Sequence, residues 1–214
     1  MFINGEQADI IRAKAVKLVT EVLDFSRGDH TYQDVCKGYT PGYGTSCTFL
    51  PHWMLLNLGV SGLNMSRGVP KDTSPPKPRP LINRDDLARG TKMVAGDGVS
   101  VIANSPAFVT MKPNLKAYPQ PGDIVVIQKE PYNQPDEHVF VFLGKLADNL
   151  WDTGESGQAP SKAADGTVEG KRKKREMRIS DMSMIAKATP DKPVDRKVQG
   201  WLDISKLDYV SGSV

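Results

Sequence analysis

The second half of the chain contains a succession of short apolar segments, and this succession limits the fold more than any other feature. The segments are "DIVVIQ" (Asp123–Gln128), "EHVFVFLG" (Glu137–Gly144) and "NLWDTGESGQ". Runs of this length, rich in Val, Ile and Phe and bounded by turn-forming residues, predict β-strands. Because short loops join them, we expect an antiparallel meander. Two later segments, "EMRISDMSMIAK" and "VQGWLDISKL", predict further strands, the last with a terminal turn.

Two helices are predicted ahead of these strands. Apolar residues recur at three- and four-residue steps from Glu6 to Phe25, which predicts one helix. Residues Cys47 to Leu58 predict a second helix, which is apolar nearly all round and which Gly59 ends, so we expect it to be buried. Helices followed by consecutive strands indicate the α+β class. We expect one domain over residues 1–214, with inserted loops at about 60–116 and 159–175.

Charge and hydropathy argue against two classes of function. A net charge of +3 over 214 residues gives no general attraction to polyanions. The basic run "KRKKR" (Lys171–Arg175) has no interleaved aromatic residues, so we expect a mobile loop drawn to anionic envelope polymers rather than a nucleic-acid site. The sequence has no apolar window of about 18 residues, so we expect no membrane span.

The first residues of the chain do not resemble a Sec signal peptide, because Glu6 and Asp9 interrupt the apolar stretch. We therefore expect synthesis in the cytoplasm, and specialised export if the target lies in the periplasm or cell wall of another cell. The two cysteines are Cys36 and Cys47. A cytoplasmic start disfavours a disulfide between them.

Cys47 stands at the predicted start of the second helix, directly after the glycine-rich "GYGTS". The N–H groups at a helix start, with their partial positive charge, favour a thiolate over a thiol, whose ordinary pKa is about 8.5. The same groups can stabilise an oxyanion during acyl transfer, and the Cys47 N–H is the obvious donor. The position therefore favours a nucleophile.

A thiol nucleophile needs a base, and the chain has three histidines. His52 lies five residues after Cys47 on the same predicted helix and points away from it; His30 lies in a polar loop. His138 opens the apolar strand "VFVFLG", and by pattern alone it is either a base at the sheet edge or an ordinary strand start at the surface. Either Asp152 or Glu155 can orient it, but strand alternation places these two acids on opposite faces.

Together, "GYGTSCTFLPHWML", "QPGDIVVI", "HVFVFLG" and "WDTGESGQ" resemble the papain-like cell-wall hydrolases of the CHAP and NlpC-like families, over roughly residues 38–158. The resemblance implies that Cys47 is the nucleophile, His138 the general base and Glu155 the third residue, with Asp152 as the alternative. Ser46 takes the place of the CHAP glutamine, and Tyr43 or Tyr39 would supply the oxyanion or substrate contact. The "DCSG" of the NlpC-like group is absent.

The resemblance implies a papain-like cysteine peptidase or amidase that cleaves an amide bond in the peptidoglycan stem peptide. The missing signal fits a phage lysin or an antibacterial effector of a type VI secretion system, with an immunity protein or the secretion apparatus as partners. The alternatives are a papain-like protease, deamidase or acyltransferase toxin with a protein substrate, and a non-enzymatic binding module. No cofactor is expected, and the histidines have no ligand spacing that predicts a metal site.

Overall fold

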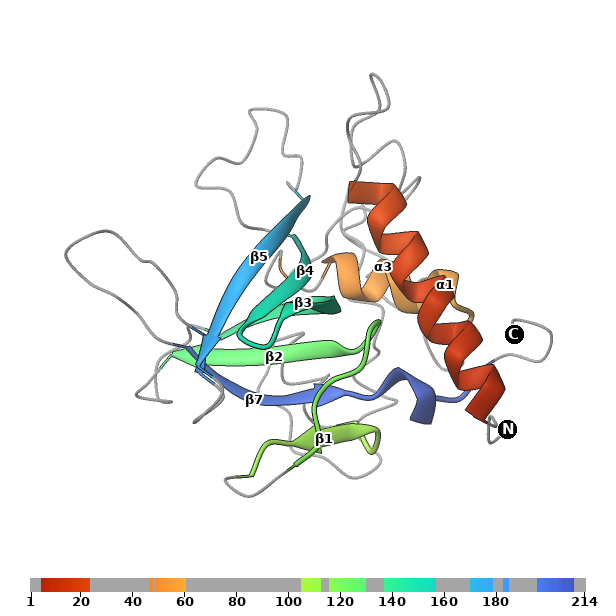
Figure 1. The fold of residues 1–214 in the computed structure, drawn as a ribbon. Helices are drawn as coiled ribbons and strands as arrows, with labels where there is room; N and C mark the ends of the chain where they lie inside the picture. The colour runs from red at the N-terminus through yellow and green to blue at the C-terminus, as the bar shows by residue number, and fades with distance from the viewer. Residues whose placement is uncertain are drawn as a thin grey trace, which may run out of the picture.

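The computed structural model describes residues 5–23, 47, 49–60, 105–112, 116–129, 137–156, 170–178, 183–184 and 196–209. Two helices come first, α1 (Gly5–Leu23) and α3 (Phe49–Asn57). The strands are β1 (Phe108–Thr110), β2 (Ile124–Lys129), β3 (Glu137–Ala147), β4 (Leu150–Ser156), β5 (Gly170–Arg178), β6 (Ser183–Met184) and β7 (Arg196–Leu202). A 3-10 turn, η3 (Ile204–Lys206), follows β7. This order confirms the α+β class (Figure 1).

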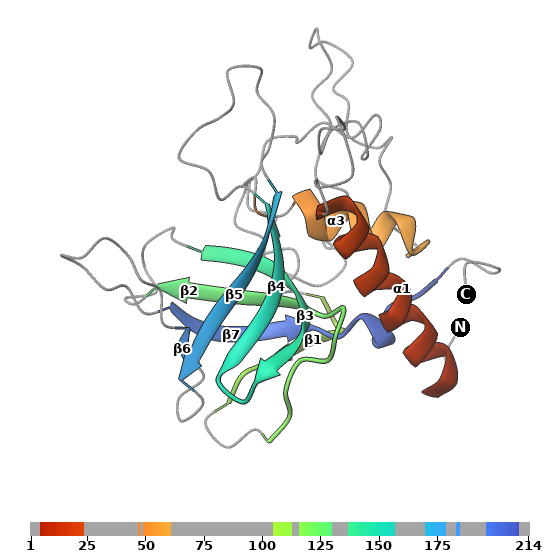
Figure 2. The same ribbon diagram turned by 45° about the horizontal axis from the view of Figure 1, so that its top comes forward.

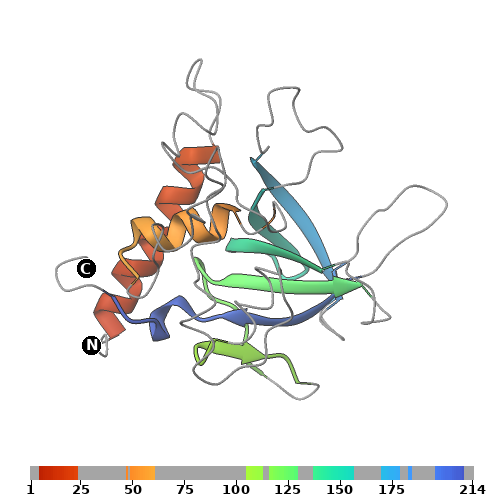
Figure 3. The same cartoon turned by 180° about the vertical axis from the view of Figure 1, so that it is seen from behind.

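The strands form an antiparallel sheet in the order β1-β7-β2-β3-β4-β5-β6. β6 also pairs with β7, which closes strands β2 to β7 into a ring. Along one edge of β7, β6 pairs with Arg196 and Lys197, and β1 pairs with Gly200, Trp201 and Leu202. Both helices lie on one side of the ring, as Figures 1 and 3 show from opposite directions.

Alternation along β3 separates two apolar cores. Val139 and Val141 pack in a cluster with the buried residues of α1 and α3, whereas Phe140 and Phe142 pack in a second cluster on the opposite face. The second cluster draws on five strands and fills the inside of the ring, as expected when side chains alternate across a closed sheet. Its other buried members are Val125, Ile127, Trp151, Met177, Val198 and Trp201.

α1 packs on the ring through an apolar stripe and through one close approach at a glycine. α1 buries Ile11, Ala15, Val19, Val22 and Leu23, which recur at three- and four-residue steps as predicted. On β4, a Cβ at Gly154 would lie 2.4 Å from Val19 Cγ1, so a glycine is needed for α1 to reach the sheet. None of the helices in these described segments is long and apolar enough to cross a membrane.

The second predicted helix is confirmed, with a shifted start. α3 begins at Phe49, and Cys47 lies in a 3-10 turn before it. Gly59, with φ of 74°, ends the helix as expected, because the Val60 N–H donates to the Leu55 carbonyl over 3.2 Å in the pattern of a glycine-capped helix end.

The predicted loop over residues 159–175 is wrong for its last part. Residues 170–175 belong to β5, which pairs with β4 from Leu150↔Glu176 to Ser156↔Gly170. The run "KRKKR" is therefore a strand, with Lys173 and Arg175 half-buried. Lysine and arginine carry no strand pattern of their own, and only the pairing with β4 gives this segment its conformation. The region at about 60–116, where we expected an inserted loop, contains one described strand, β1, which pairs with β7.

Candidate functional site

The structure brings together His138 and Glu155. His138 Nε2 lies 2.9 Å from Glu155 Oε2, and both side chains are buried. Glu155 shares its face of β4 with Trp151 and Thr153, as strand alternation predicted, and that face lines the inside of the ring. On β3, His138 lies on the face of Phe140, with the two ring centroids 6.5 Å apart. The pair therefore joins two neighbouring strands through their inward faces.

This pair lies where β3 and β4 separate. Among the described residues, the pairing of these two strands ends at Val141↔Gly154. Beyond that point β3 continues along β2, and β4 continues along β5 up to Ser156↔Gly170 (Figure 2). The start of β3 and the end of β4 lie at the same end of an antiparallel pair. The His138–Glu155 hydrogen bond thus crosses the separation at one rim of the ring.

Glu155 has several further partners. Thr153 Oγ1 donates to its Oε1 over 2.7 Å, Arg175 Nε donates to Oε1 over 2.5 Å, and the other arm of Arg175 donates to Oε2. Lys173 Nζ lies 3.9 Å from Oε2. Burial alone would raise the pKa of Glu155, but the hydrogen bonds from His138 and Arg175 and the charge of Arg175 outweigh it and lower this pKa to about 2. Glu155 is therefore a carboxylate at neutral pH.

The charge state of His138 follows from the same contacts. Burial lowers the pKa of His138 below its ordinary value of 6.5, and the charges of Arg175 and Arg196 add to this against the raising effect of Glu155. The imidazole is therefore neutral at neutral pH. An ionised carboxylate only accepts hydrogen bonds, so Nε2 carries the hydrogen that faces Glu155. The other ring nitrogen, Nδ1, is then the basic one.

Cys47 is buried and is tied to the same rim through its backbone. Ser156, the last residue of β4, donates its hydroxyl to the Cys47 carbonyl over 3.2 Å. The same hydroxyl accepts from the Leu50 N–H over 3.2 Å. These two bonds attach the N-terminus of α3 to the residue after Glu155. Figures 1 and 2 show α3 starting beside the end of β4.

Asp152 lies apart from His138. Strand alternation places its side chain on the opposite face from Glu155, where Arg172 Nε donates to both carboxylate oxygens over 3.0 Å. Of the two acids weighed from the sequence, only Glu155 therefore contacts His138. Ser46, Tyr43, Tyr39, Cys36 and His30 lie outside the described residues, as does the side chain of His52.

Sequence reasoning missed Thr153, Ser156, Lys173 and Arg175. Thr153 and Ser156 were inside a predicted strand, but nothing in their spacing marked them as partners of Glu155 or of the helix. Arg175 was assigned to a loop, and it lies 20 residues from Glu155 along the chain. Only the register of β5 against β4 reveals the contact.

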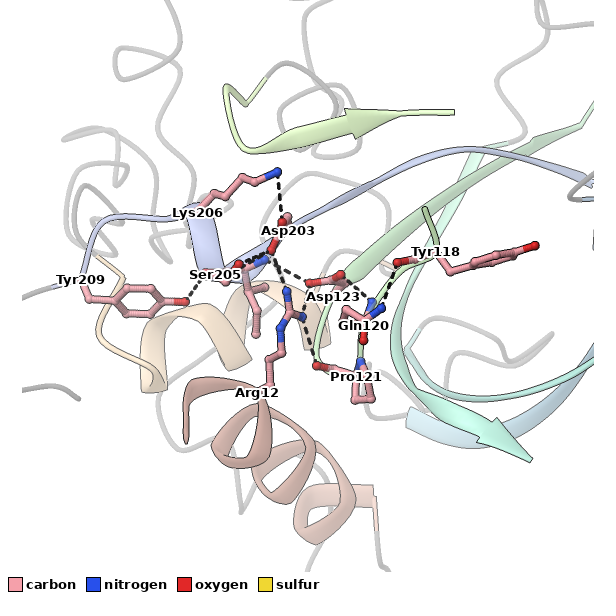
Figure 4. Close-up of polar contacts among 10 residues, drawn as sticks. Arg12, Tyr118, Gln120, Pro121, Asp123, Asp203, Ser205, Lys206 and Tyr209 are labelled. Carbon is pink, nitrogen blue, oxygen red and sulfur yellow. Dashed lines mark hydrogen bonds and ion pairs between the residues drawn. The ribbon is translucent and has the colours of Figure 1, made fainter. Parts of the chain in front are cut away.

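A second buried charged cluster joins α1 to the other end of the ring (Figure 4). Arg12 donates to Asp123 Oδ1 over 2.6 Å, to Asp203 Oδ1 over 2.7 Å and to the Pro121 carbonyl over 3.3 Å. Asp123 also accepts from the N–H groups of Gln120 and Ile204. Burial raises the pKa of Asp123 to about 6 against the lowering effect of Arg12. This cluster holds α1, the turn before β2 and η3 together.

No family model, no curated protein and no solved structure matches this chain. Among the described residues, no three His, Cys, Asp or Glu side chains gather in a way that would hold a metal ion.

Proposed function

We propose that the chain is a papain-like cysteine hydrolase that cleaves an amide bond in the peptidoglycan stem peptide. The observation that carries the proposal is the buried His138–Glu155 pair at the rim to which Ser156 ties the backbone of Cys47. A thiol just before a helix start, a neutral imidazole and an ionised carboxylate are groups that nucleophilic acyl transfer uses.

The roles follow from the chemistry of each group. Nδ1 of His138 takes the proton of the Cys47 thiol, and the thiolate attacks the amide carbonyl carbon. N–H groups at the start of α3 stabilise the oxyanion that forms there. The C–N bond breaks, His138 returns the proton to the leaving amine, and a thioester remains. Water then loses a proton to His138 and adds to the thioester, the S–C bond breaks, and His138 returns the proton to the Cys47 sulfur. Glu155 orients His138 throughout.

The substrate class rests on the resemblance to the CHAP and NlpC-like hydrolases. A helix-start cysteine, "PGDIVV", a strand-start histidine in "HVFVFLG" and a polar residue on the next strand occur here in that order. We extend the proposal to one papain-like domain over residues 1–214, acting in the periplasm or cell wall of a target cell after specialised export. An immunity protein is the expected partner of such an effector.

Digestion of purified sacculi tests this proposal. Wild-type protein, Cys47→Ala and Cys36→Ala are incubated with sacculi, and released fragments are identified by mass spectrometry. Cys36→Ala is the matched control, since it removes the chain's other thiol. We expect stem-peptide fragments from wild type and Cys36→Ala, and none from Cys47→Ala.

Two results would contradict the proposal. Equal digestion by Cys47→Ala would exclude Cys47 as the nucleophile. No digestion by any of the three proteins would exclude a peptidoglycan substrate. If Cys47 still reacted rapidly with a thiol alkylator in that case, a protein substrate would become the better explanation.

A further inference from the structure

Two arginines of β5 each bind a carboxylate of β4, in very different surroundings. Arg172 pairs with Asp152, and the Arg172 side chain is 57% exposed although that of Asp152 is buried. Arg175 pairs with Glu155, and its side chain is 14% exposed. The two pairs use the same chemistry on the same two strands, but of the two only the Arg175–Glu155 pair contacts His138, the one histidine whose side chain the structure describes.

We propose that Arg175 is a positioning residue of the candidate site: by donating to both oxygens of Glu155, it fixes this carboxylate against His138 Nε2 and leaves Nδ1 as the proton acceptor. The planar guanidinium fork suits two parallel hydrogen bonds to one carboxylate and prevents its rotation. Thr153 adds a third bond from the same face. This role rests on the proposed function, because a proton acceptor is useful only if Cys47 reacts.

Arg175 also affects the charge of His138. Among the described residues, the charged groups at the His138–Glu155 pair are Glu155 itself from β4, Arg175 and Lys173 from β5, and Arg196 from β7. Burial lowers the pKa of His138, Glu155 raises it by accepting its hydrogen bond and by its negative charge, and the charges of Arg175 and Arg196 add to the lowering. His138 therefore rests neutral, and it takes the Cys47 proton before the thiolate attacks. A resting thiolate–imidazolium ion pair is not the starting state.

Nitrogen NMR of histidine-labelled protein tests this inference without any substrate. The chain has three histidines, so His30 and His52 serve as internal references, and His138→Gln assigns the third signal. We expect wild-type His138 to be neutral at pH 7, with the hydrogen on Nε2. In Arg175→Gln we expect the pKa of His138 to rise by about one pH unit, because one neighbouring positive charge is lost. Arg172→Gln is the matched control and should leave this pKa unchanged.

Several outcomes would overturn the inference. They are a wild-type His138 that is charged at pH 7, a hydrogen on Nδ1, an unchanged pKa in folded Arg175→Gln, or an equal rise in Arg172→Gln. If Arg175→Gln does not fold, Arg175→Lys keeps the charge without the fork. For Arg175→Lys we expect an unchanged pKa of His138 and a mixture of its two neutral forms, with the hydrogen on Nδ1 or on Nε2. A single form with the hydrogen on Nε2 would overturn the positioning role. Failure of sacculus digestion alone would count against the proposed function and not against these contacts.

Discussion

Asp123 and Glu155 are both buried carboxylates bound by an arginine, and their pKa values move in opposite directions. Asp123 receives two of its bonds from backbone N–H groups, and Asp203 adds a second negative charge nearby. Glu155 receives its bonds from side chains, with Lys173 as a second cation. Burial raises the pKa of Asp123 to about 6, whereas the partners of Glu155 overcome burial and lower its pKa to about 2.

The comparison shows that an arginine beside a buried acid does not by itself indicate a chemical role. The Arg12 cluster joins a helix to the ring and contains no histidine or cysteine, so its consequence is stability. The Arg175 cluster contains a neutral histidine at the rim where Cys47 is attached, so we propose a chemical role for it. Whether such a pair has a stabilising or a chemical role depends on the groups around it.

The largest expected effect is on reactivity, and it separates the two acids. Glu155→Gln should slow sacculus digestion by about 10²–10⁴-fold, because an amide cannot both accept from His138 and neutralise Arg175. Asp123→Asn and Asp152→Asn should stay close to wild type. Initial rates of fragment release measure this, with thermal unfolding recorded for each variant. Equal loss in Asp152→Asn would contradict the choice of Glu155.

The next effect is on stability, and it belongs to the other cluster. Arg12→Met should lower the free energy of unfolding by about 3–5 kcal/mol, because it leaves two carboxylates without their shared cation. Urea denaturation measures the change. Lys17→Ala is the control on the same helix: its 3.8 Å pair with Glu21 is exposed, so we expect about 0.5 kcal/mol or less. Similar losses in both variants would mean that Arg12 is an ordinary surface residue.

The smallest effect is in the pH dependence of stability. Because the pKa of Asp123 rises on folding from 3.8 to about 6, its contribution is fully present below about pH 4 and is lost as the pH rises through 6. The loss is on the order of 1–3 kcal/mol. Glu155 has the opposite sign: its contribution is present above pH 4.5 and is lost as the pH falls toward 2.

Asp123→Asn tests the predicted loss of stability that Asp123 causes as the pH rises. Wild type should lose stability relative to Asp123→Asn between pH 4 and pH 6, as measured by urea denaturation at each pH. A constant difference between the two proteins over that range would mean that Asp123 has an ordinary pKa in the folded chain.

Strong periodic patterns made much of the fold predictable from the sequence. The spacing of Ile11, Ala15 and Val19 determines the buried side of α1, and the apolar runs determine β2 and β3. Alternation along β4 also separated Glu155 from Asp152 before any contact was known. These features are local, since each depends only on residues that are neighbours along one helix or strand.

Only the tertiary structure decided the rest. The closing of the ring through β6 and β7, the pairing of β5 with β4, and the attachment of Cys47 to Ser156 join residues far apart in the chain. A run of lysines and arginines has no alternation of apolar and polar residues that would predict a strand. The position of Arg175 against Glu155 therefore could not be predicted from the sequence. The sequence by itself indicated which residues are candidates for chemistry, and it placed Glu155 and Asp152 on opposite faces of one strand. The surroundings that set their charge arise only when the strands pair, because pKa shifts depend on burial and on neighbours in space.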